Sequence, residues 1–199
     1  FLAGHNSITS DSFFAALADG GYRVILTIRD PRDQIISHYF YYLNKFNDGN
    51  SVDNQDFLQK FNMSDAINML TTGFILPTIA RTSLPVRMFN FVNNYYSNCQ
   101  RLEIPFFLCK YEQLLNDKSK TLRALNDFLG LSLDEQQYNY IINETSFNSK
   151  SDSDSHKSVK RKGKSGEWKN YFSDSNKAIF KAHSGELLIK LGYENDYSW

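Results

Sequence analysis

The segment Arg29–Ser37, with the sequence RDPRDQIIS, combines side chains that can hold a phosphate group. Arg29 follows the apolar, β-branched run Val24–Ile28, which is typical of a strand buried on both faces of a parallel sheet. Open α/β sheets bind ligands at the carboxyl ends of their strands, where Arg29 is expected. Its guanidinium can bind a phosphate as a fork, and Ser37, two turns into the next helix, can add a hydrogen bond. The alternative is an ordinary strand-to-helix turn with a solvated arginine.

A second candidate anion site is the segment Arg161–Asn170, with the sequence RKGKSGEWKN. Two adjacent cations precede Gly163 and Gly166, whose small size lets the backbone approach an anion closely. The alternative is a basic surface loop that binds polyanions, because Lys157, Lys160, Lys164 and Lys169 lie nearby. The ordered glycine spacing and the Trp-Lys-Asn ending favour a built anion site over a solvated run.

Composition excludes several classes of protein. The 199 residues include 22 basic and 22 acidic side chains, so the formal net charge is zero and general nucleic-acid binding is not expected. Cys99 and Cys109 are too few for a disulfide scaffold or a thiolate metal site, and with only four histidines we expect no metal. Such cysteine usage favours a reducing, cytoplasmic location. No apolar run approaches the roughly 18 residues of a membrane span.

Apolar patterning predicts helices that alternate with two buried strands, which indicates an α/β layered domain. The expected strands are Val24–Ile28 and Ile104–Cys109, and the expected helices are Asp11–Ala18, Pro31 to near Gly49, Ser64–Leu70, Pro85–Asn98, Thr121–Phe128, a helix through Asn143, and Ser175–Leu191. The helix caps predicted from residue type are Asp30, Ser64, Ser132 in a capping box with Glu135, and Gly130.

Four motifs together resemble one known family. Arg161–Asn170 closely resembles the RKGxxGDWKN signature of the cytosolic sulfotransferases, with Glu167 in place of the usual aspartate. Tyr22–Tyr39 resembles the strand and helix with which that family binds a 3′-phosphate. Lys110–Leu115 is similar to its YEDL segment and leads into an FLGL-like helix, and Thr145–Phe147 matches its TSF motif. The chain is therefore similar to sulfotransferases of the cytosolic and bacterial type.

The resemblance implies an α/β, P-loop-NTPase-like three-layer domain with a central parallel sheet, spanning residues 1–199 as a single domain. It implies 3′-phosphoadenosine 5′-phosphosulfate (PAPS) as the sulfuryl donor, 3′,5′-adenosine bisphosphate (PAP) as the product, and no metal. The implied cofactor-binding residues are Arg29 and Ser37 with Arg161, Lys162 and Gly163 for the 3′-phosphate, and Tyr111, Thr145 and Phe147 for the adenine. From residue type alone, Tyr111 and Phe147 could equally belong to the core, and Trp168 is expected to pack beneath the loop.

His5 is the candidate general base. Sulfuryl transfer to a hydroxyl needs a group that accepts the acceptor's proton, and a histidine with a pKa near neutrality suits that role. In the resembled family a histidine precedes the 3′-phosphate strand by about two dozen residues, as His5 precedes Arg29 here. Its Gly-His-Asn setting differs from the family's Lys-Thr-His, and the alternative is an ordinary loop histidine.

One element of the resembled family is missing from the sequence. No PKSGTTW-like segment occurs, and no GxxxxGK[ST] segment, so the loop that cradles the 5′-phosphosulfate is not found. In the family this loop precedes the catalytic histidine. We therefore expect the chain to lack an N-terminal strand and loop, and expect little catalysis from these residues alone.

The leading hypothesis is a PAPS-dependent sulfotransferase that acts on a hydroxyl or amine acceptor. The alternatives are an inactive nucleotide-binding relative, a polyanion-binding module that uses residues 157–169, and, more distantly, a P-loop kinase. The acceptor cannot be read from the sequence. Residues 73–91, with Phe74, Pro77, Met88 and Phe89, are candidates for its pocket or for the core. Oligomeric state is left open, with a homodimer as one option.

Overall fold

The computed structural model describes residues 10–47, 60–76, 79–145 and 163–199. Its elements are α1 (Asp11–Asp19), β1 (Val24–Ile28), α2 (Pro31–Asn47), α3 (Met63–Thr72), β2 (Gly73–Leu76), β3 (Ile79–Thr82), α4 (Leu84–Arg101), β4 (Phe106–Lys110), α5 (Tyr111–Asn116), α6 (Lys118–Leu129), α7 (Glu135–Glu144), the 3₁₀ helix η3 (Glu167–Asn170) and α8 (Asp174–Lys190). Among these helices, none is both long enough and apolar enough to cross a membrane.

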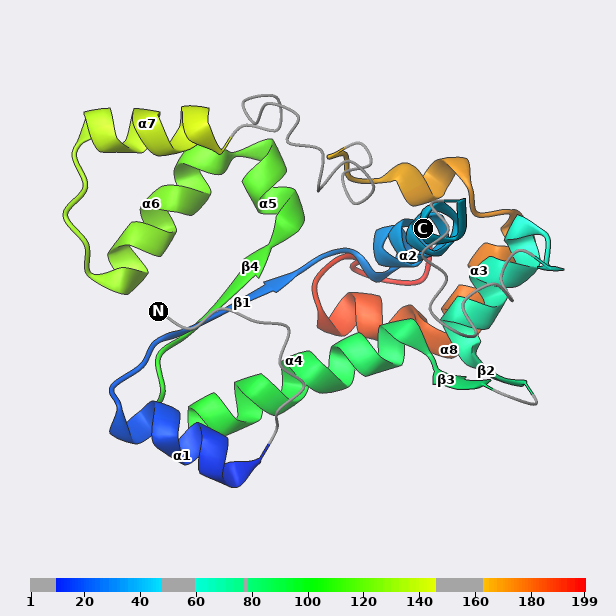
Figure 1. Cartoon of the computed structure of the whole chain (residues 1–199), viewed down its shortest axis with the longest axis horizontal. Helices are drawn as coiled ribbons and strands as arrows, with labels where there is room; N and C mark the ends of the chain where they lie inside the picture. The colour runs from blue at the N-terminus through cyan, green and yellow to red at the C-terminus, as the bar shows by residue number, and fades with distance from the viewer. Residues whose placement is uncertain (1–9, 48–59, 77–78, 146–162) are drawn as a thin grey trace.

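Strands β1 and β4 form a parallel pair that lies between helices α5–α7 and the remaining helices (Figure 1). Val24 pairs with Phe106 and Ile28 with Lys110, so both strands begin and end together. This arrangement confirms the predicted α/β class with a parallel sheet. The bounds of β1 are those expected from its apolar run.

The expectation that β1 is buried on both faces is wrong. Val24, Leu26 and Ile28 are buried, but Ile25 is 37% exposed and Thr27 is also exposed. The described part of the chain packs helices α1 and α4 against one face of this strand pair, and the alternate residues face away from that core. A continuous apolar run is therefore compatible with a strand that the described residues of its chain cover on one side only.

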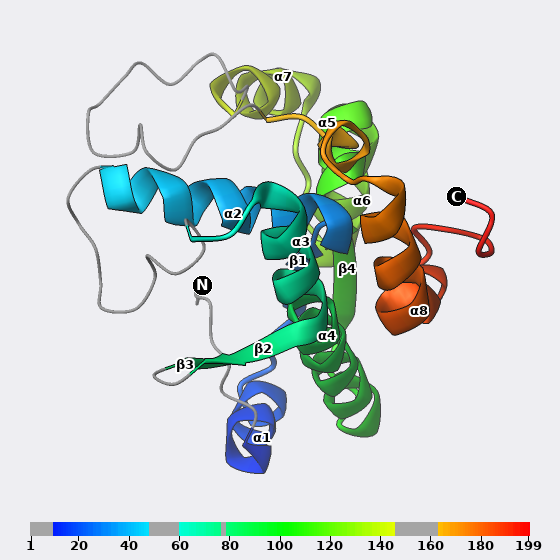
Figure 2. The ribbon, with the colours of Figure 1, turned by 90° about the vertical axis from the view of Figure 1, so that its right-hand side faces the viewer.

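Two hydrophobic clusters hold the described residues together. One joins α2, α3, α8 and η3 around Ile35, Ile67 and Phe180. The other packs α1 and α4 beneath β1, around Phe14 and Tyr95. Figure 2 shows α3 next to α2, with the β2–β3 hairpin extending from it. On α4, Val92 and Tyr95 are buried in this second cluster, whereas Tyr96 is exposed.

Most predicted helices occur, and the differences lie at their caps. Asp30 caps α2 as expected, because its carboxylate accepts a hydrogen bond from the Arg32 amide. Gly130 ends α6 in the left-handed region, at φ 69°. Helix α3 is capped by Asn62 rather than Ser64, whose hydroxyl instead donates a hydrogen bond to Asn176 on α8.

The predicted cap of α7 is also wrong. Asp134, not Ser132, accepts the amide of Gln137, and the Gln137 side chain accepts the Asp134 amide in return. This is a capping box two residues later than expected. The sequence pattern also missed the β2–β3 hairpin and the short helices α5 and η3. The hairpin and the start of α4 occupy residues 73–91, the candidate segment for the acceptor pocket.

Candidate functional site: the carboxyl edge of the parallel strands

Arg29 and Tyr111 are the first residues beyond the same edge of the sheet. Ile28 pairs with Lys110 as the last pair of the parallel ladder, so the chain leaves both strands at one level. The guanidinium carbon of Arg29 lies 5.0 Å from the centroid of the Tyr111 ring. The structure therefore brings together two residues that are far apart in the sequence, at the edge where parallel sheets bind ligands.

The Arg29 guanidinium has both used and unused donors. Its Nη2 donates to the carbonyl oxygen of Lys164, at 2.9 Å, and lies 3.7 Å from Oδ2 of Asp33. Its Nε is buried and has no hydrogen-bond partner among the described residues. A buried N–H without an acceptor is unfavourable by about 1–3 kcal/mol. The Arg29 side chain, 24% exposed, is thus held in place while one of its donors remains available.

Asp33 fixes the loop that faces Arg29. The carboxylate is fully buried and accepts two backbone amides, that of Gly166 at 2.6 Å and that of Trp168 at 2.9 Å. Gly163 and Gly166 both have positive φ, at 59° and 76°, which a glycine adopts without steric strain. One carboxylate on the first turn of α2 therefore determines the path of the glycine loop.

Glu112 connects this edge to the C-terminal segment. Its Oε1 accepts the Asp30 amide at 2.9 Å, and its Oε2 accepts the Tyr193 hydroxyl at 3.2 Å. Burial, together with the carboxylates of Glu112 and Asp30, raises the pKa of Tyr193, so the hydroxyl stays protonated and donates. Burial lowers the pKa of Lys110, against the opposing effect of the same two carboxylates. The Lys110 ammonium donates to the Gly192 carbonyl at 2.7 Å.

Ser37 and Thr145 lie on elements that border this edge. Ser37 is half-buried on α2, two turns after Arg29. Thr145 is the C-terminal cap of α7, where its hydroxyl donates to the Ile141 carbonyl and its own carbonyl accepts the Lys118 ammonium at 3.0 Å. No described contact joins Thr145 to Arg29 or Tyr111. His5, Phe147, Arg161 and Lys162 lie outside the described residues, so their predicted roles remain predictions.

Arg32, three residues after Arg29, has a different environment. Its guanidinium carbon lies 4.0 Å from the Trp168 ring centroid and 4.4 Å from that of Trp199. Its nitrogens lie 2.7 Å from Asp30 and 2.6 Å from Glu194. The Glu194 contact is an ion pair without a well-directed hydrogen bond, since Nη1 has no acceptor in line with its N–H bonds. Trp168 itself packs in the core, as expected from the sequence.

Sequence reasoning missed Asp33 and Glu112 as site residues. Asp33 lies four positions after Arg29, within helical reach of it, and that spacing was the available signal. For Glu112 the available signal was the YEDL-like segment Lys110–Leu115 that contains it, although its partners Asp30 and Tyr193 are 82 and 81 residues away along the chain.

Comparison with known proteins gives one consistent family. The sequence model of the sulfotransferase domain matches residues 5–192. Human sulfotransferase 2A1 is 28% identical over 176 residues, covering 81% of this chain and 53% of the human protein. Sulfotransferase 2A1 of Macaca fascicularis is 26% identical over 196 residues, covering 92% and 61%. The chain thus spans about half to three fifths of the length of these relatives.

Solved structures agree at the level of the fold. Mouse sulfotransferase SULT7A1 complexed with PAP superposes with a TM-score of 0.64 at 18% identity, covering 87% of this chain and 61% of the mouse chain. Retinol dehydratase in complex with androsterone and inactive cofactor PAP gives a TM-score of 0.61 at 18% identity, covering 86% and 48%. With a family match over nearly its whole length and the same fold, the chain belongs to the sulfotransferase family.

Proposed function

We propose that the chain is the 3′-phosphate and adenine side of a PAPS-dependent sulfotransferase that acts on a hydroxyl or amine acceptor. The observation that carries this proposal is the buried Arg29 Nε, which has no partner among the described residues at the edge where β1 and β4 end. Both structural relatives are complexes with PAP, which supports the same nucleotide here.

The residues around Arg29 fit a phosphate ester. A phosphate oxygen at Nε would supply the acceptor that this donor lacks, as a charge-assisted hydrogen bond. The loop through Gly163 and Gly166 lies beside it, because the Lys164 carbonyl is bonded to Arg29. Ser37 adds a hydroxyl from the adjoining helix, and the Tyr111 ring offers a face for the adenine. Arg161, Lys162, Thr145 and Phe147 complete the proposed nucleotide-binding set.

The proposed reaction moves a sulfuryl group from a phosphate oxygen to the acceptor. PAPS supplies the activated sulfuryl group. The acceptor oxygen or nitrogen attacks sulfur in line, the bond from sulfur to the 5′-phosphate oxygen breaks, and the acceptor's proton passes to His5, our candidate base. The described residues contribute by holding the 3′-phosphate of the nucleotide at Arg29, which fixes the position of the 5′-phosphosulfate relative to the acceptor.

Calorimetry with PAP tests the nucleotide site. Arg29→Ala should weaken PAP binding at least about tenfold, because a hydrogen bond to a charged group is worth about 1.5–3 kcal/mol. Arg123→Ala is the matched control, since Arg123 is an exposed arginine on α6 that pairs with Glu135 at 2.8 Å. Unchanged PAP affinity in Arg29→Ala, or an equal loss in both variants, would remove the site assignment.

The second candidate function, for these 199 residues by themselves, is nucleotide binding without transfer, because the motifs they contain resemble those for the 3′-phosphate and the adenine. It predicts that this chain binds PAP but transfers no sulfate to a phenolic acceptor. Transfer at an ordinary rate by the same 199 residues would exclude it. The same experiment distinguishes a polyanion-binding module. Such a module would not bind PAP, and its affinity for polyanions would fall steeply with salt.

A further inference from the structure

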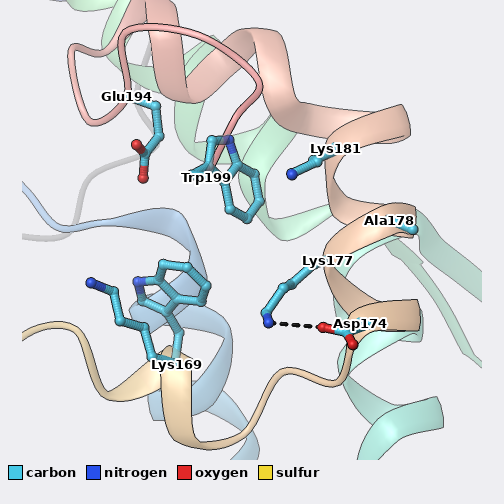
Figure 3. A pocket seen from close by; sticks show the side chains of 8 residues that line it. Lys169, Asp174, Lys177, Ala178, Lys181, Glu194 and Trp199 are labelled. Carbon is cyan, nitrogen blue, oxygen red and sulfur yellow. Dashed lines mark hydrogen bonds and ion pairs between the residues drawn. The ribbon is translucent and has the colours of Figure 1, made fainter.

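A cavity separate from the nucleotide site lies between η3, the first turns of α8 and the C-terminal segment (Figure 3). It has a volume of about 700 Å³, within the range of small-molecule sites. Trp168 and Trp199 form its inner wall, and we call it the tryptophan cleft. Neither Arg29 nor Tyr111 lines it. Because no proposed nucleotide contact lines the cleft, its ligand would differ from the nucleotide.

The charge around the tryptophan cleft is positive once its ion pairs are counted. Lys169, Lys177 and Lys181 line it, together with Asp174 and Glu194. Both carboxylates are already paired, Asp174 with Lys177 at 3.0 Å and Glu194 with Arg32 at 2.6 Å. Lys169 and Lys181 form no ion pair within 4 Å with any described carboxylate. They are the two cations of the cleft whose charge is available to a ligand.

Lys181 forms no ion pair within 4 Å with the exposed carboxylate of Asp196. The pKa of Asp196 is lowered mainly by hydrogen bonds from Ser198, with a smaller effect of Lys181. The Lys181 ammonium lies 4.9 Å from the Trp199 ring centroid, so its charge is close to the aromatic wall of the cleft.

The wall between these cations is apolar and aromatic. Trp199 is partly exposed and packs edge-on against Trp168, with ring centroids 5.5 Å apart. Its Nε1 is buried and has no hydrogen-bond acceptor among the described residues. A ligand with a flat ring and one anionic group would cover the indoles and accept from a lysine at once.

We propose that the tryptophan cleft binds a small aromatic anion, such as an arene that carries a sulfonate or sulfate group. The ring packs against Trp199, and the anionic oxygens accept hydrogen bonds from Lys181. Two observations support a ligand rather than a bare surface. The Lys181 ammonium has no described carboxylate within 4 Å and lies 4.9 Å from the Trp199 ring centroid, and the partly exposed Trp199 ring lines the cleft. This site does not depend on the nucleotide site.

Tryptophan fluorescence reports on this cleft. The chain has two tryptophans, and both line it. Titration with benzenesulfonate should give a saturable change in tryptophan emission. Methanesulfonate, which lacks the ring, and benzyl alcohol, which lacks the charge, should each bind at least about tenfold more weakly, because each loses one of the two kinds of contact.

Two lysines of α8 provide a matched pair of variants. Lys181→Gln should weaken benzenesulfonate binding about tenfold, as expected for a lost hydrogen bond to a charged group. Lys190→Gln, on the same helix but paired with Glu186 outside the cleft, should bind as the unmodified chain does. Arg29→Ala should also keep benzenesulfonate affinity while PAP affinity falls, so the two proposals fail independently.

Three results would overturn the proposal. One is the absence of a saturable response, and another is equal binding by Lys181→Gln and the unmodified chain. The third is a shift in emission with protein concentration, without ligand, together with dimerisation in sedimentation. That result would indicate that the cleft binds a second copy of the chain rather than a small anion.

Discussion

Arg29 and Arg32 leave the same strand-to-helix turn, three residues apart, and have opposite surroundings. Arg32 is 3% exposed, paired with Asp30 and Glu194, and enclosed by two indole rings. Arg29 is 24% exposed, lies 3.7 Å from a single carboxylate neighbour, and keeps a buried Nε without a partner among the described residues. The same side chain is used once to join segments and once to present a donor.

The difference lies in how completely each charge is satisfied. Arg32 lies within 2.7 Å of two carboxylates and against two indole rings, and its removal leaves both carboxylates without their partner. Each arginine keeps one buried N–H donor without an acceptor among the described residues, Nε of Arg29 and Nη1 of Arg32. What separates them is the charge: Arg29 has no carboxylate at hydrogen-bond distance, so Arg29 is the better candidate for binding an anion.

Removing Arg32 should have the largest effect on stability. Arg32→Ala leaves Asp30 and Glu194 unpaired, and breaking such a buried pair destabilises a protein by about 3–5 kcal/mol. Chemical denaturation should show this loss. Arg29→Ala, followed in the same way, should change the free energy of unfolding by less than about 1 kcal/mol, as for other partly exposed pairs. Equal destabilisation by both variants would contradict the contrast drawn between the two arginines.

Asp33→Asn should have an intermediate effect, and it should lower both the stability of the protein and its affinity for PAP. The carboxylate accepts amides from Gly166 and Trp168, and an asparagine can accept only through one oxygen. One buried amide would lose its acceptor, which costs about 1–3 kcal/mol. We expect lower stability in denaturation and weaker PAP binding in calorimetry, because the loop beside Arg29 is no longer fixed.

The control for Asp33→Asn is Asp127→Asn, on the exposed surface of α6. Asp127→Asn should leave the free energy of unfolding and the PAP affinity unchanged. If Asp33→Asn reduced stability but left PAP affinity intact, the loop would not belong to the nucleotide site.

Tyr111→Leu should have a small effect, on PAP affinity and not on the stability of the protein. The ring lies 5.0 Å from the Arg29 guanidinium, and such a contact is worth about 0.5–1 kcal/mol where partly exposed. PAP affinity measured by calorimetry should fall about threefold to fivefold through this contact and lost adenine stacking. Tyr140→Leu, an exposed tyrosine on α7, is the control. A gain in affinity on removing Tyr111 would contradict its assignment to the adenine.

His38, on α2, should make the stability of the protein depend on pH near neutrality. Burial lowers the pKa of His38, so the unfolded chain binds more protons than the folded chain as the pH falls through about 6.5. The free energy of unfolding should therefore fall below that pH. His38→Gln should flatten the decline when denaturation is followed from pH 7 to pH 5. A decline of the same steepness in His38→Gln would assign it to other groups.

Local chemistry predicted much of the fold. The strand Val24–Ile28, the Asp30 cap and the Gly130 terminus follow from β-branched composition, a carboxylate beside proline, and glycine's access to positive φ. Parallel strands also place the residue after each strand at one edge, so the position of Arg29 could be predicted. These features depend on neighbours a few residues away.

Other features depended on distant residues. Asn62 and Ser64 are both good caps, and α3 uses Asn62 because the Ser64 hydroxyl bonds to Asn176 on α8. Tyr95 rather than Tyr96 faces the core because α1 packs against that side of α4. In each case two nearby residues are equally suited by type to cap the helix or to face the core, and tertiary packing decides which of them does so.

The sequence by itself determined that two arginines follow a β-strand and that a glycine-containing basic segment occurs later in the chain. It also carried the motifs of the sulfotransferase family, to which the chain belongs. Only the tertiary structure decided which arginine lies against two close carboxylates. Glu194 and Trp199, more than 160 residues away, complete the environment of Arg32 and not that of Arg29. The charge of an arginine is encoded in the sequence, but whether that charge is already satisfied depends on which distant side chains fold against it.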